Sequence, residues 1–137
     1  MIETLPTPTD ADLAAILVPL AAHNDAAGGP TERHKIAIVH RDDADAITGG
    51  LWAEVSYRWM FVKYLALPPT AQGKGHGRAL MLAAEAEAVR LGCIGVWLDT
   101  FSFQARGFYE KLGYRVFGHI DDYPPGEARF FLFKRLA

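Results

Sequence analysis

Cysteine is almost absent from this 137-residue sequence, and its scarcity excludes whole classes of protein. Cys93 is the single cysteine, so the chain cannot form an internal disulfide and does not read as a disulfide-stabilised secreted domain. It follows Gly92 and precedes a strand-like run, where a small buried hydrophobic residue is more common than a nucleophile. The five histidines lack the paired spacing of metal ligands, so we expect no metal site.

Serines, long apolar runs and dense basic patches are also missing. Ser56 and Ser102 are the two serines, and neither lies in a Gly-x-Ser-x-Gly elbow, which argues against a serine hydrolase of that kind. No run of apolar residues is long enough to span a bilayer, and the first residues lack a signal-peptide pattern. The net charge is −2, and its 14 basic residues are dispersed. We therefore expect a cytoplasmic protein without membrane or nucleic-acid partners.

Half of the residues are hydrophobic, which is enough material for one core in a chain of 137 residues. We therefore expect a single domain over residues 1–137. A first helix begins near Thr9 and ends near Gly28, and Pro19 is expected to kink or split it. Strands are predicted at residues 36–39, 46–55, 59–67, 94–101, 114–118 and 128–136.

Two further helices are predicted between these strands. Leu80, Ala84, Ala88 and Leu91 form an apolar stripe at helical spacing, and Gly92 follows in the position of a C-terminal cap. A shorter helix is expected from about Phe103 to Leu112. The first three strands favour an antiparallel meander, whereas a strand, a crossover helix and a strand imply parallel neighbours, so the sheet is mixed.

A glycine-rich loop, Gln72–Leu80, joins a strand to the alanine-rich helix. Glycines let backbone N–H groups converge on an anion, the helix adds its unpaired N-terminal donors, and Lys74 and Arg78 add positive charge. The loop is therefore typical of a phosphate site. It matches neither the dinucleotide-binding fingerprint, which needs a glycine at Arg78, nor the Walker motif. The alternative is a glycine-rich turn that only connects two elements.

Two motifs resemble those of the Gcn5-related N-acetyltransferases. Gln72-x-x-Gly75-x-Gly77, behind the apolar segment 65–69, resembles their acyl-CoA pyrophosphate loop, with Gln in place of the commoner Arg. The segment Ala105–Tyr114 resembles the family's Ala, Phe-Tyr and Gly-Tyr pattern on the helix after the fifth family strand. One departure is Ser102, which stands where the family often has Asn and has a shorter reach.

The resemblance implies an α/β (α+β) fold, with a mixed, twisted, mostly antiparallel sheet of six to seven strands flanked by helices. Its central pair, here the strands ending at Leu67 and Phe101, splays apart to admit the pantetheine arm of acetyl-CoA, the co-substrate. The expected contacts to acetyl-CoA come from the strand edge, the loop and the residue at the family's Asn position: Leu65, Ala66, Leu67, Gln72, Gly73, Lys74, Gly75, His76, Gly77, Arg78 and Ser102.

The implied reaction is direct attack of a primary amine of a small molecule or peptide on the thioester of acetyl-CoA. The matching tyrosine, Tyr109, is expected to protonate the departing thiolate, although without the loop a core aromatic would be the preferred interpretation. The resemblance fixes no general base. Glu54 and Asp99 are candidates, and each also fits an ordinary surface carboxylate. The alternative from another class is a non-catalytic acyl-CoA-binding or regulatory module with the same fold.

Two segments near the C-terminus could contact a substrate or a second subunit. The acidic, turn-rich segment 121–126 either borders the substrate mouth, where it attracts a cationic amine, or forms a solvated hairpin loop. The run Phe130–Phe133 is apolar on both faces, which fits either a homodimer or burial of both faces within one chain.

Overall fold

A computed structural model describes residues 1–136, and the contacts between Cα atoms divide the chain into two compact units. The first unit, Met1–Thr31, contains one helix, and the second, from Glu32 onward, contains the sheet. A single domain over residues 1–137 stays a prediction.

Helix α1 (Asp10–Gly28) begins with a capping box. The Thr9 backbone N–H donates to the Asp12 carboxylate at 2.8 Å, and the Asp12 N–H donates to the Thr9 hydroxyl at 3.2 Å. These bonds satisfy two donors that a helix start leaves unpaired. The expected split at Pro19 is wrong, because α1 continues through it as one helix. A proline deletes one backbone hydrogen bond, which a capped 19-residue helix tolerates.

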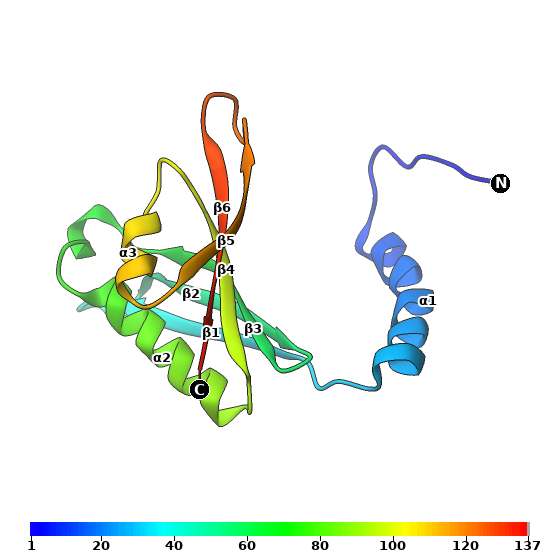
Figure 1. Ribbon diagram of the computed structural model, residues 1–137, viewed down its shortest axis with the longest axis horizontal. Helices are drawn as coiled ribbons and strands as arrows, with labels where there is room; N and C mark the ends of the chain where they lie inside the picture. The colour runs from blue at the N-terminus through cyan, green and yellow to red at the C-terminus, as the bar shows by residue number, and fades with distance from the viewer. Residues whose placement is uncertain (137) are drawn as a thin grey trace. The chain divides into compact units, whose positions relative to one another are not determined.

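The second unit is built on one six-stranded sheet with the order β1-β2-β3-β4-β6-β5 (Figure 1). Its strands are β1 (His34–Arg41), β2 (Ile47–Ser56), β3 (Trp59–Ala66), β4 (Gly95–Phe101), β5 (Arg115–Asp121) and β6 (Ala128–Arg135). Neighbouring strands pair antiparallel except β3 and β4, which are parallel. The predicted mixed, mostly antiparallel sheet is confirmed. Strand β6 lies between β4 and β5, so the apolar run 130–133 is in the interior of the sheet. This position fits the expectation that the run is buried within one chain.

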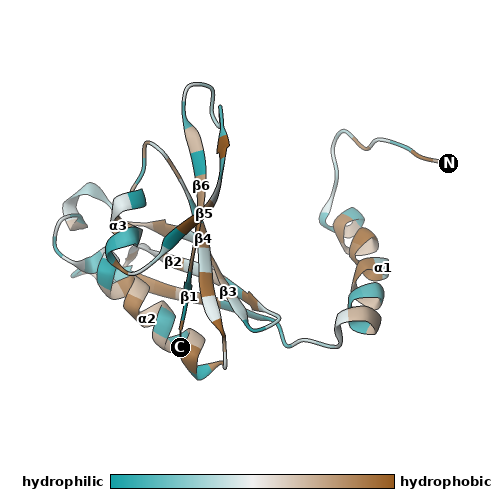
Figure 2. Cartoon of the chain, viewed as in Figure 1, coloured by the Kyte–Doolittle hydropathy of each residue, from teal (hydrophilic) through white to brown (hydrophobic). Residues whose placement is uncertain are grey.

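Three helical segments connect the strands: η1 (Pro69–Ala71), α2 (His76–Arg90) and α3 (Arg106–Lys111). Helices α2 and α3 lie on the same side of the sheet (Figure 1). In Figure 2, hydrophobic and hydrophilic residues alternate along α2, as in a helix with one buried face. Its buried residues Leu80, Met81, Ala84 and Ala88 join a core that includes Met60, Val96, Leu98 and Leu132 from the strands.

Helix α3 is shorter than predicted, because Gln104 holds the preceding residues in a turn. Its side-chain oxygen accepts hydrogen bonds from the Phe101 backbone N–H at 2.8 Å and from the Thr100 hydroxyl at 3.2 Å. The Gln104 N–H also donates to the Phe101 carbonyl at 2.9 Å. These bonds favour a turn over a helix, so α3 begins at Arg106.

Strands β3 and β4 pair along only part of their length. The parallel register runs from Trp59 opposite Gly95 to Val62 opposite Leu98 and then stops. On its other edge β3 stays paired with β2 as far as Ala66, but the register shifts so that Lys63 is an extra residue, a β-bulge. Because a bulge bends its strand, β3 leaves β4 at this point. The predicted splayed pair is confirmed.

A buried polar cluster connects α2 to the C-terminal strands. Glu85 of α2 is 9% exposed and accepts hydrogen bonds from the Tyr114 hydroxyl at 3.0 Å and from the Lys134 ammonium at 2.7 Å. Burial, followed by the nearby Glu85 charge, raises the pKa of Tyr114 well above its ordinary value. Tyr114 therefore stays neutral and donates to the carboxylate.

We expect Tyr114→Phe to lower the free energy of unfolding by about 1.5–3 kcal/mol, because it removes a buried hydrogen bond to a charged group. Urea denaturation measures this change. Tyr64→Phe is the matched control, since Tyr64 is 63% exposed, and its effect should stay within about 0.5 kcal/mol. Equal stability of the Tyr114→Phe variant and the wild type would show that the buried bond adds nothing.

Candidate active site

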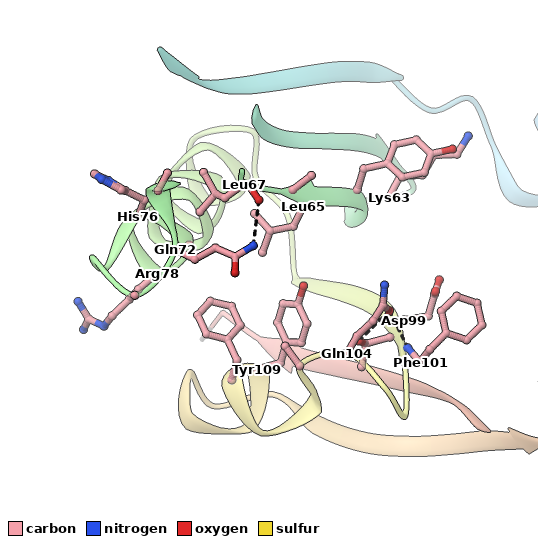
Figure 3. A pocket seen from close by; sticks show the side chains of 18 of the residues that line it. Lys63, Leu65, Leu67, Gln72, His76, Arg78, Asp99, Phe101, Gln104 and Tyr109 are labelled. Atoms are coloured by element: carbon pink, nitrogen blue, oxygen red, sulfur yellow. Dashed lines mark hydrogen bonds between the residues drawn. The ribbon is translucent and has the colours of Figure 1, made fainter. Parts of the chain in front are cut away.

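A cavity of about 970 Å³ lies where β3 and β4 part. Figure 3 shows Leu65 of β3 and Leu67, which follows β3, on one side of the cavity. Tyr109, Asp99 and Phe101 lie on the other side. The cavity brings together most of the residues that the sequence analysis selected: Leu65, Ala66, Leu67, Gln72, Gly73, Gly75, His76, Gly77, Arg78, Asp99 and Tyr109. Three selected residues do not line it: Glu54, Lys74 and Ser102.

The glycine-rich loop presents open backbone at one end of this cavity. Gly73 and Gly75 have φ values of 73° and 82°, in the left-handed region that favours glycine, and a Cβ atom at either would meet nothing within 4 Å. Gly75 is the N-cap of α2 and supplies no side-chain cap, so the first N–H groups of the helix remain available. An anion therefore fits here, with the positive end of the helix dipole toward it.

Other contacts fix the position of this loop. The Gln72 side-chain amide donates to the Leu67 carbonyl at 3.1 Å, so Gln72 holds the loop against the end of β3 (Figure 3). Gly77 faces Phe108 of α3, because a Cβ atom there would lie 3.4 Å from the ring. His76 and Arg78 line the loop end of the cavity. Lys74 belongs to the same loop but is exposed outside the cavity lining.

Tyr109 is a buried tyrosine in the wall of the cavity. Its side chain projects from α3 with the hydroxyl group toward the cavity (Figure 3), and the residue is 9% exposed. Burial, followed by the negative charge of Asp99, raises the pKa of Tyr109 to about 12. The phenol is therefore neutral at physiological pH and carries a proton that it can donate.

Asp99 lies on β4, in the cavity wall away from the glycine-rich loop (Figure 3). Its carboxylate is paired with Arg129 of β6: Nε donates to Oδ1 at 2.9 Å, and Nη2 lies 2.8 Å from Oδ2. The Arg129 side chain also donates to the Tyr123 hydroxyl at 2.9 Å. The segment 121–126 thus reaches the site through Tyr123, whereas its acidic residues do not line the cavity.

Glu54 and Ser102 have other partners. Glu54 lies on β2, where its carboxylate is 3.9 Å from the Lys63 ammonium and is 42% exposed. The Ser102 hydroxyl donates to Glu127 and accepts from the Ala128 N–H at 2.9 Å. Gln104, which follows Ser102 closely, lines the cavity instead.

Several lining residues were not predicted from the sequence. On β3, alternation of side chains along a strand groups Phe61 with Lys63, but the bulge at Lys63 breaks that alternation before Tyr64. Arg129 gives no local signal, because its partner Asp99 is 30 residues away. The missed residues are Phe61, Lys63, Tyr64, Ala71, Thr100, Phe101, Gln104, Ala105, Phe108 and Arg129.

Residues 1–136 contain neither a metal-binding cluster nor a membrane-spanning helix. Within this part of the chain, no group of three or more His, Cys, Asp and Glu side chains is arranged to hold a metal ion. No helix among these residues combines the length and the apolar character needed to cross a membrane.

Comparisons with known proteins identify the family. The model of the acetyltransferase (GNAT) domain matches residues 32–116. Blasticidin-S acetyltransferase from Streptomyces morookaense is 43% identical over 91 residues, which are 66% of this chain and 67% of that protein. Acetyltransferase Atu2258 from Agrobacterium fabrum is 33% identical over 121 residues, which are 88% of each.

Solved structures agree with this result. A crystal structure of a protein from Agrobacterium tumefaciens that is assigned to the acetyltransferases has a TM-score of 0.90 and 32% identity, over 98% of this chain and 99% of that one. An acetyltransferase from Bacillus cereus gives a TM-score of 0.84 and 26% identity, over 97% of both chains.

The named relatives are enzymes, so the comparisons favour the transferase over the non-catalytic module. The domain match covers the sheet as far as the start of β5, including the glycine-rich loop and Tyr109. The chain therefore belongs to the GNAT acetyltransferase family and is an acetyl-CoA-dependent N-acetyltransferase.

Proposed function

We propose that acetyl-CoA binds along the gap between β3 and β4, with its pyrophosphate on the loop from Gln72 to Arg78. The uncapped start of α2 and the open space over Gly73 and Gly75 support this position. Beyond Val62, the edge of β3 that faces β4 is unpaired, and its backbone groups at Leu65 and Leu67 suit the amides of a pantetheine arm. Ser102 is a weaker candidate for contact with acetyl-CoA, because its hydroxyl already forms hydrogen bonds with Glu127 and with the Ala128 N–H.

Within this arrangement, Tyr109 donates the proton that the departing thiolate needs. Its raised pKa keeps the phenol protonated, and its hydroxyl is directed into the cavity (Figure 3). Asp99 is the better candidate of the two carboxylates for contact with the acceptor amine, because it lines the cavity and Glu54 does not. Tyr109 and Asp99 both line the cavity that would hold the thioester.

We further propose that the acceptor is a primary amine of a small molecule. The observation that carries this proposal is the cavity itself, which joins the glycine-rich loop to Asp99 and the aromatic residues Phe61 and Phe101. Similarity to a blasticidin-S acetyltransferase supports a small-molecule acceptor. Purified enzyme is given acetyl-CoA and blasticidin S, a streptothricin, an aminoglycoside, spermidine or a short peptide with a free N-terminus, and free thiol is measured. Turnover confined to the peptide would contradict the small-molecule assignment.

A cytoplasmic location and the absence of nucleic-acid and membrane partners stay predictions from composition and charge. A homodimer also stays a prediction.

Gly75→Glu should weaken binding of coenzyme A by at least about 100-fold, since it sets a carboxylate against the pyrophosphate and strains a left-handed backbone position. Isothermal titration calorimetry measures the affinity. Gly126→Glu is the matched control, because Gly126 has a φ of 84° and equally open space over its Cβ position but lies outside the cavity lining. Equal affinity in folded Gly75→Glu protein would contradict the loop assignment.

Tyr109→Phe should reduce kcat by about 100-fold or more, as expected for loss of a general acid, while coenzyme A affinity and the melting temperature barely change. The assay requires an amine for which chemistry limits the rate. Because the pKa of Tyr109 is about 12, wild-type kcat should show no loss from phenol ionisation until the pH approaches that value.

Tyr114→Phe is the control that distinguishes a catalytic role of Tyr109 from a packing role. Tyr114 is also a buried tyrosine, with its ring centroid 6.2 Å from that of Tyr109, but it does not line the cavity. This variant should lose stability and keep its turnover. If Tyr109→Phe kept near-full turnover, Tyr109 would be a packing residue and the thiolate would leave without its help.

A further inference from the structure

The end of the cavity away from the glycine-rich loop contains an ion pair with a fixed geometry. Asp99 and Arg129 lie on adjacent strands, with Arg129 directly opposite Phe101 in the β4–β6 register. Two hydrogen bonds, at 2.9 and 2.8 Å, join the guanidinium to both carboxylate oxygens. A bidentate fork of this kind fixes the plane of the carboxylate as well as its charge.

Arg129 is itself held by neighbouring aromatic rings. Its guanidinium carbon lies 5.5, 5.1 and 5.4 Å from the ring centroids of Phe101, Tyr123 and Phe131, and its Nη1 donates to the Tyr123 hydroxyl. The side chain is 26% exposed and that of Asp99 is 16% exposed. The aromatic rings therefore leave the guanidinium little freedom to rotate away from the carboxylate.

The charge of Asp99 acts on the reaction centre, since it contributes to the raised pKa of Tyr109. A carboxylate offers about four lone-pair positions, and the fork from Arg129 occupies two of them. Within residues 1–136, Asp99 has no other hydrogen-bond donor. Its remaining lone pairs can therefore accept hydrogen bonds from an amine that enters the cavity.

We infer that Arg129 is a positioning residue for the acceptor: it holds the Asp99 carboxylate in the orientation that receives the acceptor's amino group. This inference rests on the proposed function and goes further, because it assigns the acceptor contact to a pair in which Arg129, itself a lining residue, acts through Asp99. Without the fork, the carboxylate can turn away from the cavity and binds the amine with less directional precision.

Steady-state kinetics of wild type and Arg129→Gln test the inference, with acetyl-CoA and the most rapidly acetylated amine of the panel above. In Arg129→Gln, kcat/KM for the amine should fall by about 10- to 100-fold, mainly through KM, while KM for acetyl-CoA stays unchanged. Arg129→Lys keeps the charge without the fork, so it should recover only part of the loss. Arg135→Gln is the matched control, because Arg135 lies on the same strand, 5.7 Å from the Trp59 ring centroid and outside the cavity lining.

A double-mutant cycle with Asp99→Asn separates a positioning role from a direct one. If Arg129 acts through Asp99, then adding Arg129→Gln to Asp99→Asn should change kcat/KM by less than about twofold. Fully additive losses, or an unchanged amine KM in Arg129→Gln, would overturn the inference while the transferase assignment stands. A wild type that acetylates no amine would overturn the proposed small-molecule function and this inference together.

Discussion

The parting of β3 and β4 after Val62 and Leu98 is the constraint on which the site depends. Each strand keeps its outer partner beyond that point, β3 with β2 and β4 with β6, so the gap opens without loss of the sheet. The bulge at Lys63 turns β3 away at the residue where pairing with β4 ends. The inner edges then present backbone groups without strand partners, which suit an amide-bearing ligand. A continuous β3–β4 ladder would close the cavity and satisfy these groups internally.

Beyond Val62 and Leu98, β3 and β4 do not stabilise each other, so other contacts must stabilise this part of the fold. The buried cluster of Glu85, Tyr114 and Lys134 connects α2 to the last strand immediately beside the site, because the Tyr114 ring lies next to Tyr109. The two buried tyrosines both have raised pKa values but differ in their surroundings. Tyr114 donates to the Glu85 carboxylate, which does not line the cavity, whereas the Tyr109 hydroxyl is directed into the cavity (Figure 3).

Features set by neighbouring residues could be predicted from the sequence, and features set by pairing between distant segments could not. Glycine spacing indicated the loop, and the Ala105–Tyr114 motif indicated Tyr109, because both depend on short segments. The Asp99–Arg129 pair depends on the β4–β6 register, which no local pattern specifies. The bulge at Lys63 is likewise a property of the β2–β3 pairing. The shortened α3 has a third cause, because side-chain hydrogen bonds from Gln104 override helical propensity.

The two ends of the cavity differ in charge, and each end suits one of the two proposed substrates. The loop end offers free N–H groups, a helix start and the cation Arg78, which favour the phosphates of acetyl-CoA. The other end offers the Asp99 carboxylate, whose remaining lone pairs favour an amine, and Arg129 fixes its orientation. Tyr109 lies between them, and the nearby negative charge makes its proton harder to lose to solvent. One carboxylate can therefore accept hydrogen bonds from the acceptor and keep the proposed acid protonated until the leaving thiolate, a stronger base than water, forms beside it.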